Sequence, residues 1–132
     1  MKNRWKQTEA DSHSADEHTG LRVYSSQLLG QDADLVLHGG GNTSVKGTLL
    51  NAFGDTEQVL FVKGSGWDLR SIEAPGFPPV KLNTLLRLGE LEALSDSEMM
   101  RQLRLALLDP TAPTPSVEAI LHALIPHKYV DH

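Results

Sequence analysis

The chain of 132 residues contains no cysteine. This absence excludes a disulfide framework, a zinc site built from thiolates and a cysteine nucleophile, and it fits a reducing compartment. The chain also has no apolar run that approaches the roughly 18 residues of a membrane span. Its first thirty residues lack the apolar core of a signal peptide. The sequence therefore predicts a cytoplasmic protein without a membrane partner.

Positive charge is scarce and scattered along the chain. Twelve lysines and arginines stand against seventeen aspartates and glutamates, which gives a formal net charge of -5. Nucleic-acid-binding proteins gather basic residues into a patch or stripe, and no such cluster occurs in this sequence. With 39% hydrophobic and 22% charged residues, the composition predicts one globular domain and no nucleic-acid partner.

The N-terminal residues differ from the rest of the chain. Residues 1–20 are polar and predict a solvated or partly ordered arm, whereas residues 21–132 have the patterning of a domain. Apolar residues at helical spacing predict a helix that begins at Leu21 and ends at Gly30, and a short helix over 82–88.

Two serines mark the expected starts of the later helices. Ser95, with Glu98 three positions on, forms the capping-box pattern and predicts a helix that ends before Pro110. Ser116 is expected to cap the last helix. The apolar stripe of that helix comprises Val117, Ile120, Leu121, Leu124 and Ile125.

Two short apolar runs predict buried strands that enter glycine-rich turns. Residues 35–37 lead into three glycines and then Asn42, Thr43 and Ser44, and residues 59–62 lead into the turn at 64–66. Such turns can aim backbone N–H groups at an anion, although an ordinary tight turn explains the first of them equally well. Neither has the glycine spacing of a Walker loop or a dinucleotide fingerprint, so the pair favours a small anionic ligand over a nucleotide.

Ionisable residues gather toward the C-terminal end of the chain. Glu118 is expected in the first turn of the last helix, with His122 one turn later on the same side. A first-turn glutamate often serves only as a partner of the helix dipole. His122 and His127 are better explained as surface or hydrogen-bonded histidines than as metal ligands. His132 differs from them, because residues 129–132 predict the opening of a further strand and His132 is the last residue.

Four motifs, taken in order, resemble the class II aldolase/adducin family and in particular its bifunctional members of the rhamnulose-phosphate aldolase/dehydrogenase type. The likeness runs from about Tyr24 to the last residue. The motifs are Gly-Gly-Gly-Asn-Thr-Ser-Val-Lys (39–46), Val-Lys-Gly-Ser-Gly-Trp-Asp-Leu (62–69), Pro-Ser-Val-Glu (115–118) and Pro-His-Lys-Tyr-Val-Asp-His (126–132).

The resemblance implies a three-layer α/β/α fold and zinc-dependent retro-aldol cleavage of a ketose, usually phosphorylated, with zinc as the Lewis acid. By similarity, Glu118 is the general acid/base and His132 is the first histidine of a His-x-His zinc pair. The pocket for the phosphate or hydroxyl groups of the substrate is implied to contain Asn42, Ser44, Ser65, Gly66 and Ser116.

The chain also departs from the family pattern. It holds at most one of three expected zinc ligands, and Val117 stands where several members of the family carry a serine, which favours a sugar without phosphate. We expect an N-terminal fragment of a homo-oligomeric enzyme, inactive by itself. The alternatives are a non-catalytic, adducin-like interaction domain and a sugar-binding domain.

Overall fold

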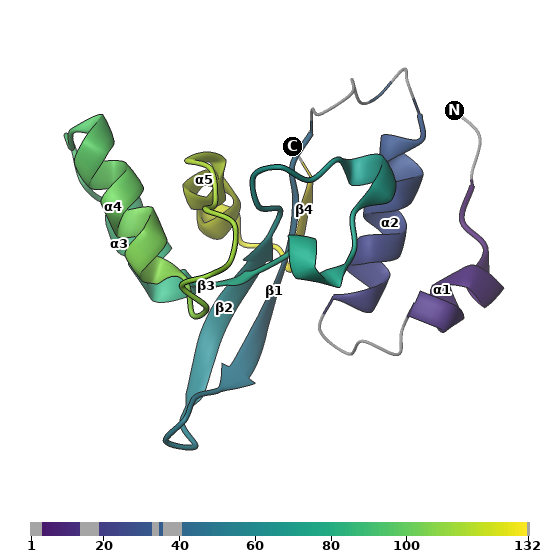
Figure 1. The fold of residues 1–132 in the computed structure, drawn as a ribbon, viewed down its shortest axis with the longest axis horizontal. Helices are drawn as coiled ribbons and strands as arrows, with labels where there is room; N and C mark the ends of the chain where they lie inside the picture. The colour runs from purple at the N-terminus through teal and green to yellow at the C-terminus, as the bar shows by residue number, and fades with distance from the viewer. Residues whose placement is uncertain (1–3, 14–18, 33–34, 36–40, 132) are drawn as a thin grey trace.

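The computed structural model describes residues 4–13, 19–32, 35 and 41–131. Figure 1 shows a central sheet with helices on either side. The elements, in chain order, are α1 (Gln7–His13), α2 (Gly20–Gly30), β1 (Thr43–Leu50), β2 (Thr56–Val62), η1 (Leu69–Ser71), η2 (Ala74–Gly76), β3 (Pro79–Lys81), α3 (Leu82–Gly89), α4 (Asp96–Ala106), α5 (Glu118–Leu124) and β4 (Tyr129–Asp131).

The strands form one antiparallel sheet in the order β3-β2-β1-β4. Strand β1 lies inside this sheet, and Ser44 stands opposite Val62 of β2 and Val130 of β4. The last strand, β4, is thereby brought beside β1, on the side of β1 away from β2.

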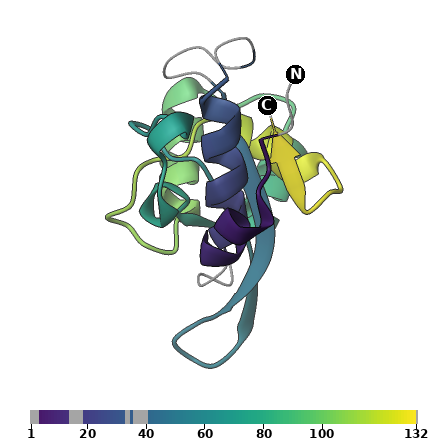
Figure 2. The same ribbon diagram turned by 90° about the vertical axis from the view of Figure 1, so that its right-hand side faces the viewer.

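Alternate residues of β2 face two different hydrophobic clusters. Leu60 and Val62 pack with apolar residues of α3, α4 and α5, whereas Val59 and Phe61 pack on the opposite face with Val23 of α2. Figure 2 shows α2 lying in front of the sheet. The three-layer α/β architecture expected from the sequence is therefore confirmed.

Most of the expected helices are present. Helix α2 ends at Gly30, α3 covers the predicted 82–88, and α4 ends before Pro110. The hydroxyl of Ser95 accepts a hydrogen bond from the amide of Glu98 at 3.2 Å, so this predicted cap is confirmed.

The strand predictions fare unevenly. Residues 59–62 lie in β2, and 129–131 form β4, as predicted. Of the strand expected over 35–37, only Leu35 belongs to the described residues, and it lies in a turn. Strand β1 was missed: it begins at Thr43, inside the segment interpreted as a turn, because its half-exposed residues break the apolar pattern that marks a buried strand.

The apolar stripe predicted for the last helix is wrong at three of its five positions, whereas Ile120 is partly buried against the core, as predicted. Val117, Leu121 and Leu124 are 55%, 45% and 49% exposed, and α5 instead buries Ala119, His122 and Ala123 against the rest of the domain. Small side chains on this face let the helix approach the sheet closely.

The described part of the N-terminal arm packs on α2. The rings of Trp5 and Tyr24 meet edge to face with their centroids 4.8 Å apart, and the amide of Lys6 donates to the hydroxyl of Tyr24 at 2.8 Å. Ala10 is fully buried. Among the described helices, none combines the length and apolar character needed to cross a bilayer.

Candidate functional site

A cavity of about 220 Å³ opens where three loop segments meet at the ends of β1 and β2 and the start of α5. Four of the residues implied by the resemblance line it: Asn42, Ser65, Ser116 and Glu118. The lining is completed by Gly41, Lys63 and Gly64.

Asn42 holds the polar wall of this cavity together. Its Nδ2 donates to Oε2 of Glu118 at 3.1 Å and to Oγ of Ser116 at 3.3 Å. The side chain is 95% buried, yet its Oδ1 has no hydrogen-bond partner among the described residues. What Asn42 contributes to the cavity wall is therefore its Nδ2 group, which holds Glu118 and Ser116 together.

Ser116 lines the cavity and does not cap α5. The predicted cap at Ser116 is wrong, because the N-cap position of α5 is Val117 and no side chain caps the helix. The hydroxyl of Ser116 accepts the bond from Asn42 instead. Glu118 is thus the first residue of α5, which places its carboxylate at the rim where helix and strand meet.

The second glycine turn is shaped by close packing. A Cβ on Gly64 would lie 2.7 Å from Cβ of Pro113, and the amides of Gly64 and Ser65 donate to the carbonyls of Gly76 and Thr114. These two amides are therefore not aimed at an anion, which corrects the expectation drawn from the sequence. Ser65 lines the cavity, whereas Gly66 turns with a φ of +88° and is not part of the lining.

Ser44 lies beneath the cavity and does not line it. It is fully buried, and its Oγ is 2.7 Å from Nδ1 of His122, which is also fully buried. His122 is thus the hydrogen-bonded histidine that the sequence favoured over a metal ligand.

Lys63 is the functional candidate that sequence reasoning missed. It immediately precedes Gly64 in the second motif and brings a cation to a cavity that the carboxylate of Glu118 also lines. A basic residue next to a glycine turn at a strand end was the available signal. The cavity therefore offers one positive group, one negative group and several neutral hydrogen-bonding groups to a small polar ligand.

The metal ligand implied by the resemblance, His132, lies outside the described residues. Within the described part of the chain, no group of three His, Cys, Asp or Glu residues is arranged to hold a metal ion. The described residues therefore do not by themselves fit a zinc site.

Arg22 anchors the strand that leads to His132. Its Nη1 lies 2.6 Å from Oδ1 of Asp131 and donates to the carbonyls of Ser44 and Val130, and the guanidinium stands 5.5 Å from the ring centre of Tyr129. Burial lowers the pKa of Arg22, and the nearby Asp131 carboxylate opposes that shift. Helix α2 is thereby tied to both β1 and β4.

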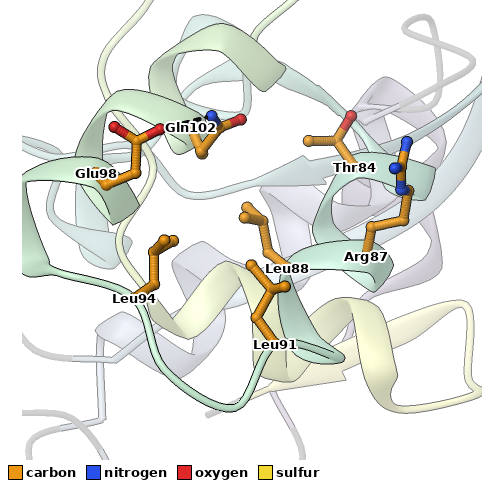
Figure 3. Close-up of a pocket in the computed structure, with 7 residues that line it drawn as sticks. All are labelled: Thr84, Arg87, Leu88, Leu91, Leu94, Glu98 and Gln102. Carbon is orange, nitrogen blue, oxygen red and sulfur yellow. Dashed lines mark hydrogen bonds between the residues drawn. The ribbon is translucent and has the colours of Figure 1, made fainter.

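A second cavity, of about 360 Å³, lies between α3 and α4 (Figure 3). Its leucines come from α3 and the segment that follows, and Glu98 and Gln102 of α4 form its polar side. None of the residues implied by the resemblance contributes to it, so the first cavity remains the candidate site.

Comparisons with known proteins place this site in context. No family model matches the chain. Over 110 residues it is 41% identical to the protein called uncharacterized oxidoreductase YuxG of Bacillus subtilis (strain 168), covering 83% of this chain and 16% of that protein. It also resembles the solved structure of the N-terminal class II aldolase domain of a conserved protein from Thermoplasma acidophilum, with a TM-score of 0.85 and 42% identity.

That structural likeness covers 100% of this chain and 59% of the solved chain, so the present chain spans less than two thirds of each of these two proteins. The match nevertheless extends over every layer of the fold and over the segments that form the candidate site. In sequence and in fold, the chain is thus a class II aldolase-like domain, and its resemblance to the class II aldolase/adducin family is confirmed.

Proposed function

We propose that the chain forms the part of a sugar aldolase that binds a ketose or ketose phosphate and moves the proton during retro-aldol cleavage. The observation that supports this proposal most directly is the arrangement at Asn42. One buried amide bonds both the carboxylate of Glu118 and the hydroxyl of Ser116, so three polar side chains that line the cavity are held together.

The neutral and cationic groups of the cavity suit a polyhydroxylated ligand. Hydroxyl groups of a sugar both donate and accept, so Asn42, Ser65 and Ser116 offer matching partners. Lys63 adds affinity for an anionic group such as a phosphate. With Val117 55% exposed and unable to donate a hydrogen bond, the choice between a free and a phosphorylated sugar depends on Lys63.

Retro-aldol cleavage needs a group that carries a proton to or from the reacting atoms. A carboxylate within reach of the substrate performs this role, and Glu118 is the one carboxylate among the residues that line the cavity. In the complete protein we infer that zinc supplies Lewis-acid chemistry and that His132 is one of its ligands. Binding of the sugar and transfer of the proton are the parts that this chain's described residues account for.

We also infer a cytoplasmic, homo-oligomeric protein whose partner is a small sugar rather than a nucleic acid or a membrane. An adducin-like interaction domain remains the competing function. The two differ in one observable property, because only the aldolase requires the carboxylate of Glu118.

The test is Glu118→Gln in an aldolase-active protein that contains this chain. We expect turnover to fall by about a hundredfold or more while sugar binding is retained, because the amide keeps the shape of the side chain but cannot transfer the proton. Glu90→Gln, at an exposed position after α3, is the matched control and should leave turnover unchanged. Equal turnover of the wild type and the Glu118 variant would remove Glu118 from the mechanism.

A further inference from the structure

Three side chains at alternate positions along one strand each bind the same helix. Asn42, which directly precedes β1, bonds Glu118; Ser44 bonds His122; and Lys46 reaches the C-terminal end of α5. Successive side chains of a strand point to opposite faces, so positions 42, 44 and 46 share the face that looks toward α5. We refer to these three residues as the β1 ladder.

The spacing of the ladder matches the spacing of the helix. Two residues along a strand advance about 6.6 Å, and four residues along a helix advance about 6 Å. The partners of the ladder, Glu118, His122 and Ile125, accordingly follow one another by about one turn of α5. Strand and helix are thus joined at three consecutive levels.

Lys46 makes the most extensive connection. Its Nζ donates to the carbonyl of His122 at 2.9 Å, to that of Ile125 at 2.7 Å, and to that of His127 beyond the helix end. The last carbonyls of a helix have no partner within the helix, and a cation there also opposes the negative end of the helix dipole. Lys46 therefore closes the end of α5 that lies opposite Glu118.

Helix α5 depends on such external connections. It has seven residues and no side-chain N-cap, and its outer side chains are exposed. Helices this short are not stable by propensity alone, so tertiary bonds fix where they lie. A shift of α5 along β1 would move Glu118 relative to the cavity.

We propose that Lys46, together with Ser44, is a positioning residue that fixes α5 against β1 and so keeps the carboxylate of Glu118 at the cavity. Neither side chain lines the cavity, so both act through the helix. The catalytic consequence rests on the proposed function, but the structural consequence can be measured without it.

The first experiment uses the 132-residue chain and follows amide hydrogen exchange in α5. Lys46→Met should raise exchange of the α5 amides by about tenfold relative to those of β2, because bonds from a charged donor are lost. Lys46→Arg should restore protection. Lys81→Met, at an exposed position of β3, is the matched control and should change nothing in α5. Unaltered exchange in the Met variant would overturn the proposal, whatever reaction the protein catalyses.

Ser44→Ala is the second variant, and it keeps the proposal testable if Lys46→Met does not fold. It removes one hydroxyl and leaves the lysine in place. We expect a smaller rise of exchange in α5 together with a shift of the ring NMR signals of His122, because Nδ1 loses its partner at 2.7 Å. Unchanged ring signals would show that the ladder does not hold the helix.

The second experiment measures steady-state kinetics in the aldolase-active protein. Lys46→Met should lower kcat by about tenfold while KM stays within about threefold, since the groups that bind the sugar are untouched and only the proton-transfer group is displaced. Lys46→Arg should rescue kcat. An equal change in KM, or no rescue by arginine, would contradict a positioning role. If Glu118→Gln leaves turnover intact, the proposed function fails. The exchange experiment still tests whether Lys46 and Ser44 fix α5 against β1.

Discussion

Gly30 shows how one residue can determine the packing of two segments. A Cβ at this position would lie 2.2 Å from the backbone N of Arg70 and 2.6 Å from the carbonyl carbon of Leu69, so η1 approaches the end of α2 as closely as a glycine permits. Backbone atoms cannot swing aside as a flexible side chain does. The glycine is therefore required by its neighbour as well as by the helix end.

We expect Gly30→Ala to lower the free energy of unfolding by about 1–3 kcal/mol, the usual cost of overpacking. Urea denaturation monitored by circular dichroism measures this loss. Gln31→Ala, at the exposed neighbouring position, is the control and should stay within about 0.5 kcal/mol of the wild type. If both variants unfold at the same urea concentration, η1 can move away from α2 without measurable loss of stability.

At the same scale, the sequence identified the chemistry of the site better than its geometry. Asn42, Ser116 and Glu118 could be singled out from their motifs, and all three line one cavity. Ser44 was grouped with them, yet it faces His122, because the direction of a strand side chain depends on where the strand begins. Lys63 was overlooked because its position next to a glycine turn is a weaker signal than a spaced motif.

At the scale of single elements, α4 combines several local signals that act together. Ser95 caps its first turn, and Glu98 in that turn bonds both Arg101 and Gln102. We expect Ser95→Ala to reduce the free energy of unfolding by about 1 kcal/mol through loss of the cap. Thermal unfolding tests this, with Ser71→Ala, an exposed serine of η1, as the control. If the cap does not stabilise the fold, Ser95→Ala and Ser71→Ala will melt at the same temperature.

The same turn gives α4 a dependence on pH. The hydrogen bond from Gln102, aided by Arg101, holds the pKa of Glu98 below its ordinary value of 4.5. A carboxyl whose pKa is lower when folded stabilises the fold above its unfolded pKa, and this contribution is lost as the pH falls through the folded value. Glu98 is exposed to solvent, so the contribution is small.

We therefore expect Glu98→Gln to flatten the decline of Tm between about pH 5 and pH 3, because the amide cannot be protonated in this range. Melting curves across this range measure the slope. Glu92→Gln, at an exposed position before α4, serves as the control and should keep the slope of the wild type. A Glu98 variant with an unchanged slope would show that its bonds to Gln102 and Arg101 do not persist in solution.

Elements bounded by local signals were predictable, and elements defined by their partners were not. Caps, glycines and prolines located α2, α3 and α4 within a few residues. The buried face of α5 could not be found in this way, because it depends on two different partners. Ala119 and Ala123 enter the apolar cluster of β2, α3 and α4, whereas His122 meets the polar side chain of Ser44 on β1.

At the scale of the whole molecule, the outer face of α5 exposes several apolar side chains close together. Val117, Leu121 and Leu124 lie exposed along the helix, and Tyr129 is exposed on β4, which forms an edge of the described sheet. Exposed apolar stripes and open strand edges both favour association. The chain in solution is therefore expected to self-associate.

We predict that Leu121→Lys shifts the 132-residue chain toward monomer without loss of helix content, because this side chain is 45% exposed, whereas Leu124 packs on Gly89 of α3. Sedimentation velocity over a range of concentrations measures the shift. Leu105→Lys, which is 58% exposed on α4, is the matched control and should leave the association unchanged. A wild-type chain that stays monomeric throughout would show that this face is not an association surface.

The alternating side chains of β1 also limit how this protein can vary in length. Thr43 and Val45 contact α2 or the cluster on its side, while Ser44 and Lys46 hold α5. Inserting or deleting one residue here would exchange the two sets of partners at once, so the strand tolerates substitutions but no change of frame. The hairpin tip at 51–55 projects away from both helical layers (Figure 1) and has no such restriction. Within the β1–β2 hairpin, we therefore expect an inserted residue to be tolerated at the tip and not within β1.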